Sequence, residues 1–223
     1  MAGPSPGTRR PQRAWEERAL DRVRQQALQR GHRLVKAARE LVAEAGLESV
    51  TLRALLDKTG LARRAFYSHF RSMDDVLLAL FEDTMASGAA RLREQLAAID
   101  DPIDALEHVV RTIASTALSP SERIYTLAMT QEHMRLAEHR PDELNAALAP
   151  MSELIADVLR AGMKTGAVRE TDPGSLSEIV HALIATEVHR NLYRGADDTD
   201  WIDELWEFCL GGIALSSRWR RWV

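Results

Sequence analysis

The sequence has one cysteine, no pattern typical of β-strands and no long apolar segment, and each absence excludes a class of protein. Because Cys209 has no partner in the chain, no internal disulfide is possible and an oxidising compartment is not indicated. The N-terminal residues 1–14 contain three prolines, two glycines and three arginines without an apolar stretch, which is not typical of a secretory signal. The uncharged run 208–217 is far shorter than the ~20 residues that span a bilayer. We therefore expect a cytoplasmic protein without a membrane segment.

Sequence motifs for catalysis, cofactors and metals are also missing. The chain contains no Gly-x-Ser-x-Gly, no glycine-rich phosphate loop and no His-Glu-x-x-His. On a helix, His133 and His139 would project about 120° apart, and His181 and His189 would lie roughly 12 Å apart along the axis. Cys209 is most simply a small core residue. We expect neither an enzyme nor a cofactor nor a metal site.

Charge is distributed unevenly along the chain. Residues 1–80 contain 15 Lys and Arg against 9 Asp and Glu, a net charge of +6, whereas residues 81–223 contain 14 against 24, a net charge of −10. A basic first third on an acidic remainder indicates that one end of the protein meets a polyanion. Chance clustering is the alternative explanation.

The apolar residues recur at intervals of three and four, which predicts an all-α fold with about nine or ten helices. Residues 1–14 are expected to form a disordered basic arm. Gly46 is expected to end a long first helix, which Gly31 divides in two, and Pro150 is expected to bend or interrupt a later one. The expected helical segments are 15–45, 52–59, 63–70, 72–96, 102–118, 121–138, 141–166, 173–193 and 198–219.

The second and third of these segments, joined by a turn at Gly60, have the dimensions of a helix-turn-helix. On a helical wheel Phe66 and Phe70 fall on one side and predict the core face. The opposite arc holds Arg64, Ala65 and Ser68, with Tyr67 and His69 beside it. Small and polar residues allow a helix to approach base edges in the major groove, and arginine can bond guanine at two atoms.

Other residues near this motif suit contacts with DNA phosphates. The free amides that follow Thr51, together with Arg53, form an expected anion site at a helix N-terminus. Tyr67, His69 and Arg71 can bond backbone oxygens, which fixes the register of a complex without reading sequence. The predicted DNA-binding residues are Thr51, Arg53, Arg63, Arg64, Ala65, Tyr67, Ser68, His69 and Arg71.

Residues 34–81 resemble the DNA-binding domain of the tetracycline-repressor family. The resemblance lies in Ala37-Ala38, Leu41, Gly46, Thr51, Leu55, Gly60-Leu61, Phe66-Tyr67, Phe70, Ser72 and Leu77. It implies a three-helix DNA-binding head, residues 15–72 here with an N-terminal extension. It also implies a helical domain for regulation and dimerisation, residues 73–223. A homodimer on a palindromic operator, controlled by a small molecule, is the expected mode of action.

Two positions depart from the family pattern. Ala62 stands where the family often has a serine cap, and Met73, followed by two aspartates, stands where it usually has a lysine that contacts phosphate. Losing this cation is expected to flatten the salt dependence of DNA binding by roughly one unit. Our hypothesis is that Arg9, Arg10 and Arg13 of the arm compensate by reaching DNA; a solvated tail is the alternative.

For the C-terminal domain, the resemblance implies a four-helix dimer interface built from the last two long helices of each subunit. The expected interface residues are Ile179, Leu183, Trp206, Cys209, Gly212 and Ile213. The expected lining of an effector pocket is Tyr125, Met129, His133, Met151 and His181, which suits an apolar or amphipathic small molecule. In both cases the alternative is that these residues belong to the core of a single chain.

The sequence therefore predicts a transcriptional regulator, a repressor that a small-molecule effector releases from DNA. An architectural DNA-binding protein without an effector is the second hypothesis, and it predicts no fillable cavity in the body. A third hypothesis is an enzyme or carrier with a merely structural helix-turn-helix, and the uneven charge distribution disfavours it.

Overall fold

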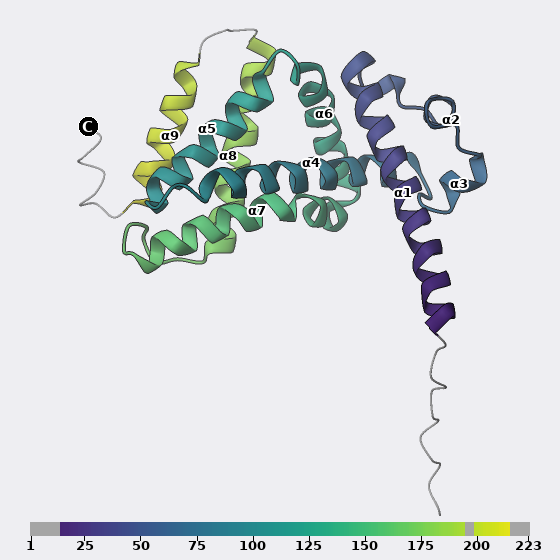
Figure 1. Ribbon diagram of the computed structural model, residues 1–223. Coiled ribbons are helices and arrows are strands. Elements are labelled where there is room, and N and C mark those ends of the chain that lie inside the picture. The colour runs from purple at the N-terminus through teal and green to yellow at the C-terminus, as the bar shows by residue number, and fades with distance from the viewer. Residues whose placement is uncertain (1–13, 195–198, 215–223) are drawn as a thin grey trace, which may run out of the picture.

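The computed structural model describes residues 14–194 and 199–214, and every regular element within these ranges is a helix (Figure 1). The expected all-α class is confirmed. The elements are α1 (Ala14–Ala45), η1 (Leu47–Ser49), α2 (Leu52–Thr59), α3 (Arg63–Tyr67), α4 (Met73–Leu96), α5 (Pro102–Leu118), α6 (Arg123–His139), α7 (Pro141–Lys164), α8 (Pro173–Arg194) and α9 (Asp200–Ile213). The predicted basic arm, with Arg9, Arg10 and Arg13, lies outside the described residues. None of the helices described is long and apolar enough to cross a membrane.

Several helices differ from the sequence-based expectation, and α9 ends at Ile213 although it was expected to continue to 219. Helix α1 continues through Gly31, because a single glycine costs a helix only about 1 kcal/mol. Helix α7 continues through Pro150, where buried side chains on both sides of the proline hold it against the core. Helix α3 ends at Tyr67, earlier than expected, because the backbone and hydroxyl of Ser68 cap it.

The N-terminal head owes its shape to local signals in the sequence. Gly46 and Gly60 end α1 and α2 with φ values of 76° and 66°, a region that favours glycine. The Thr51 hydroxyl accepts a hydrogen bond from the Ala54 amide at 3.1 Å and caps the start of α2. Leu55 and Phe66 are fully buried against α1. These contacts fix α3 against α1, and the side of α3 opposite Phe66 faces outward.

The buried residues of the described chain form two apolar cores rather than one. The first core joins the head to α6 and the beginning of α7, as far as Ala147. The second core joins α5, α8 and α9 to the rest of α7, from Met151 onward. Helix α4 runs through both, contributing residues up to Phe81 to the first core and residues from Ala89 to the second (Figure 1). The body therefore divides near Pro150 of α7.

Candidate nucleic-acid interface and regulatory body

Helix α3 separates an anchoring face from an exposed face as the helical wheel predicted. Phe66 and Phe70 are buried, with their ring centroids 5.8 Å apart. Arg63 and Arg64 are exposed, and Tyr67 keeps 51% of its surface accessible. The Arg63 guanidinium lies 5.6 Å from the centre of the Tyr67 ring and donates a long hydrogen bond of 3.4 Å to its hydroxyl. The outer face thus combines two cations with a phenol.

The other residues predicted to contact DNA differ in how far they are exposed. Thr51 and Arg53 are exposed at the start of α2, and the Arg53 side chain makes only a 3.6 Å ion pair with Asp57 on its own helix. Ala65 is half-buried, and the exposed Ser68 donates its hydroxyl hydrogen to the Ala65 carbonyl. Both α2 and α3 therefore expose polar residues.

Two predicted contacts have additional roles within the protein. The ring of His69 is half-buried beside Gly31 of α1, which turns it toward the head rather than fully outward. The Arg71 side chain is exposed, while its backbone amide donates a 2.8 Å hydrogen bond to Asp75. Arg71 is therefore free to reach a phosphate from a fixed backbone.

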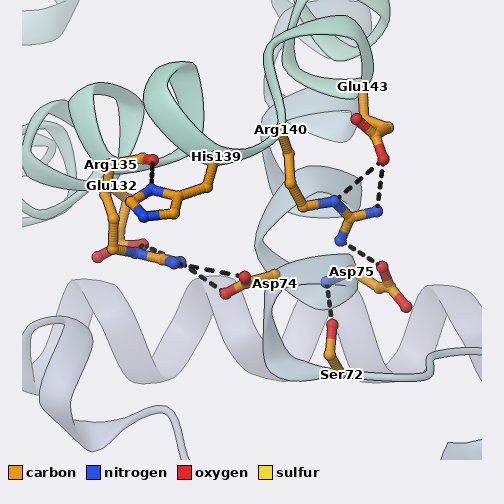
Figure 2. Close-up of polar contacts among 8 residues, drawn as sticks. All are labelled: Ser72, Asp74, Asp75, Glu132, Arg135, His139, Arg140 and Glu143. Carbon is orange, nitrogen blue, oxygen red and sulfur yellow. Dashed lines mark hydrogen bonds and ion pairs between the residues drawn. The ribbon is translucent and has the colours of Figure 1, made fainter.

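The sequence analysis missed the role of the two aspartates at the start of α4. Asp74 pairs with Arg135 of α6, and Asp75 pairs with Arg140 at the α6–α7 junction, each at 2.6 Å (Figure 2). Figure 2 also shows the predicted Ser72 cap, whose hydroxyl accepts from the Asp75 amide at 3.2 Å. The only sequence signal was an acidic doublet in place of a cation, and the arginines that match it lie about 60 residues away.

The predicted pocket residues are divided between the two cores, and none of them lines the groove of about 370 Å³ between residues 69–70, the start of α4 and α7. Tyr125 and Met129 belong to the first core and Met151 to the second. The Tyr125 and Thr84 hydroxyl groups share a hydrogen bond of 2.5 Å. Burial raises the pKa of Tyr125. The ring centroid of His133 lies 6.2 Å from that of Phe81, a residue of the first core, and His133 is close enough to His181 to lower the pKa of that residue.

Both of these histidines are neutral near pH 7. Burial lowers the pKa of His133, and burial together with the neighbouring His133 lowers the pKa of His181 to about 4. The Nδ1 atom of His181 lies 3.4 Å from the Ser152 hydroxyl oxygen. Neutral imidazoles in an apolar surrounding offer one donor and one acceptor each.

The predicted interface residues divide between the surface and the core. Ile179 is 56% exposed, Leu183 is half-buried and Gly212 is exposed. Trp206, Cys209 and Ile213 instead pack inside the chain against the second core. Helix α9 buries its most apolar arc against α5 and α8, so these three side chains serve as internal core. Sequence analysis did not select Phe208, the most exposed large apolar residue of α9 at 68%.

The helix-turn-helix of α2 and α3, carried on a larger helical body, defines the class of protein: a DNA-binding regulator. Comparison with known families agrees. Residues 34–80 match the model of the family described as bacterial regulatory proteins, tetR family. These residues therefore carry a tetR-family DNA-binding domain, and the resemblance found in the sequence is confirmed.

Similar proteins extend the comparison over most of the chain. The HTH-type transcriptional repressor KstR2 of Mycobacterium tuberculosis is 24% identical over 188 residues, which are 84% of this chain and 86% of that protein. A crystal structure of RolR with resorcinol has a TM-score of 0.69 and 19% identity over 88% of this chain and 94% of its own. Thermus thermophilus FadR with lauroyl-CoA has a TM-score of 0.66 and 19% identity over 83% and 95%. These structures share the fold of this chain.

Proposed function

We propose that the protein is a repressor that binds a palindromic operator as a homodimer and leaves it when a small molecule binds the body. The observation that carries this proposal is the outer face of α3, where Arg63, Arg64 and Tyr67 project from a helix that Phe66 and Phe70 anchor. The similar protein KstR2 is named a transcriptional repressor, which supports repression rather than activation. Such a protein works in the cytoplasm, where bacterial DNA lies.

On DNA, the residues of the head take different roles. Arg64 reads a base edge in the major groove, with Ala65 and Ser68 allowing close approach. Arg63, Tyr67 and the amides after Thr51 bind phosphates, and Arg53 and Arg71 add charge on either side. His69 contributes through its position between α1 and α3.

The homodimer forms through the outward faces of α8 and α9. Ile179, Leu183 and Phe208 supply apolar surface, and the exposed Gly211 and Gly212 allow close helix approach. Apart from neighbouring atoms of α9 itself, nothing in the described chain would lie within 4 Å of a Cβ at either position, which leaves room for a partner helix. Two subunits are required because two α3 helices must enter major grooves about 34–36 Å apart.

The effector binds at the boundary between the cores, among α6, α7 and α8. Tyr125, Met129 and Met151 supply apolar lining, and His133 and His181 supply neutral hydrogen-bonding groups. These groups suit an uncharged apolar or amphipathic molecule that carries a hydroxyl or carbonyl. Resorcinol, bound in the RolR structure, is an uncharged molecule of this kind, whereas lauroyl-CoA, bound in the FadR structure, shares only the apolar chain and carbonyl and carries charged phosphates.

The decisive experiment measures binding of the purified protein to DNA that flanks its own gene, with and without a panel of small molecules. A two-fold-symmetric footprint that one compound removes is the expected result. A footprint that no compound changes would favour an architectural DNA-binding protein, and the absence of sequence-specific binding would contradict the proposal.

A further inference from the structure

The start of α4 follows α3 in the chain, and Arg135 and Arg140 bond both of its acidic residues (Figure 2). Asp74 accepts two hydrogen bonds from the guanidinium of Arg135, at 2.6 and 3.3 Å. Asp75 accepts one from Arg140 at 2.6 Å. Paired bonds between arginine and carboxylate fix direction as well as distance.

Each of these arginines also forms an ion pair with a glutamate. Glu132 is buried on α6 and accepts from Arg135 at 2.7 Å, which raises the pKa of Arg135 further above its ordinary value. Glu143 accepts from Arg140 at 3.1 Å. The two guanidinium groups are therefore fixed in place before they meet the aspartates, and little side-chain entropy is lost in holding the contact.

Asp75 links the body directly to the backbone just after α3, the proposed recognition helix. One oxygen of its carboxylate accepts from Arg140, and the other accepts from the amide of Arg71, which directly follows Phe70. Burial alone would raise the pKa of Asp75, but these hydrogen bonds hold it below its ordinary value. The carboxylate is therefore charged at neutral pH and links two segments of chain.

A second charged contact fixes the other end of α6 to the head. Arg39 of α1 donates to Glu122, just before α6, at 2.8 Å, and its guanidinium lies 4.2 Å from the centre of the Tyr125 ring. The same arginine reaches Thr84 of α4 at 3.3 Å. Helix α6 is therefore bonded at both of its ends, to α1 near its start and to the beginning of α4 near its end, and the first apolar core fills the space between them.

The contacts of α6 with α8 are different in kind. Arg123 donates to the Leu192 carbonyl at 2.6 Å, and Gln131 donates to the Tyr193 hydroxyl at 3.3 Å. These are polar contacts between helices whose buried residues belong to different cores. A groove of about 370 Å³ lies between residues 69–70, the start of α4 and α7, and Asp75 and Glu143 of the ion pairs line it.

We propose that Arg135 and Arg140 are positioning residues for DNA recognition, which make α6 and the first turns of α7 one rigid unit with the head. This inference rests on the proposed function, because the orientation of a head matters when two heads must fit one duplex. The unit that moves during regulation is then larger than the helix-turn-helix domain. Its limits lie near Gly88 of α4 and Pro150 of α7, where the two cores meet.

A distance measurement tests the positioning role without DNA. Spin labels are attached at Glu48→Cys in the head and Glu138→Cys in α6, both exposed positions, and the labelled chain is mixed with excess unlabelled chain. Cys209 stays unlabelled because it is buried and its thiol has a pKa raised to about 11. In R135Q/R140Q we expect a broader distance distribution and at least a fivefold weaker affinity for DNA from the experiment above.

Two further variants separate positioning from a general loss of stability. Arg160→Gln removes a similar ion pair with Asp157 on the same helix as Glu143 but far from the head, and it should leave distance and affinity unchanged. Asp74→Asn combined with Arg135→Gln should weaken DNA affinity no more than the stronger of the two single changes, because both changes remove the same contact. An unchanged distance distribution, or an unchanged or tighter DNA affinity in R135Q/R140Q, would overturn the positioning role. A wild-type chain that binds no DNA would instead overturn the proposed function.

Discussion

At the residue scale, Arg64 is the side chain of α3 best placed to read a base. We predict that Arg64→Ala costs about 1–3 kcal/mol of DNA-binding free energy and relaxes base preference at one position per half-site, because a bidentate contact to one base is lost. Fluorescence anisotropy with single-base operator variants measures both effects. Arg93→Ala removes an exposed charge from α4, outside the head, and serves as the control. Equal losses on all sequences would assign Arg64 to phosphate contact instead.

His181 is expected to make the stability of the protein depend on pH. Burial lowers its pKa to about 4 in the folded state, whereas the unfolded chain binds a proton near pH 6.5. Stability is therefore complete above about pH 6.5 and decreases as the pH falls toward 4, by up to about 3 kcal/mol. Urea unfolding at pH 7.5, 6 and 5 measures this loss.

The matched variant for this prediction is His181→Gln, which keeps a hydrogen-bonding group opposite Ser152. It should flatten the profile between pH 6.5 and 4, since its side chain does not titrate. A variant profile as steep as that of the wild type would show that other groups cause the pH dependence, His133 first among them because burial lowers its pKa too.

At the scale of single elements, the sequence predicted where helices begin and end better than which way they face. Glycines in left-handed conformations and hydroxyl caps act locally, so Gly46, Gly60 and Ser72 could be interpreted without a partner. The orientation of α9 depends on tertiary packing, which a helical pattern does not contain. For this reason Trp206 was assigned to an interface although it packs within the chain.

The outward faces of α8 and α9 support a prediction about assembly. Ile179→Glu or Phe208→Glu should weaken the homodimer by at least about 2 kcal/mol, because a charge would be buried in an apolar contact. Sedimentation equilibrium measures the change in dissociation constant. Met134→Glu, on an equally exposed apolar residue of α6, is the control. Wild-type and variant chains that are equally monomeric would contradict the predicted interface.

The N-terminal segment gives a prediction about salt. Helix α1 extends well before Leu34, the first residue matched by the family model, and exposes Arg18, Arg22 and Arg24. Because released counterions set the salt dependence, deleting residues 1–14 should lower the slope of log affinity against log salt by about 2–3 units. DNA titrations at four salt concentrations give this slope. An unchanged slope would mean that Arg9, Arg10 and Arg13 do not reach DNA.

At the scale of the whole molecule, the division into two cores explains how a ligand in the body can influence the head. Tyr125 and Met129 pack with the head, whereas Met151 belongs to the second core and His181 lies beside Ser152 of α7. A ligand among them contacts both units, so it favours whichever relative orientation fits it best. Coupling then needs no long chain of contacts through α4, because part of the proposed pocket moves with the head.

Pro150 gives the last prediction, because it interrupts the hydrogen bonding of α7 where the two cores meet. A proline inside a helix costs up to about 3 kcal/mol relative to alanine, so Pro150→Ala should raise the melting temperature. The same change should stiffen the boundary and weaken release from DNA by an effector identified in the panel. Pro141→Ala, at the first position of the same helix where proline is tolerated, should do neither. If Pro150→Ala stabilised the protein but left release unchanged, α7 would not be a hinge, and regulation would have to act through α4 alone.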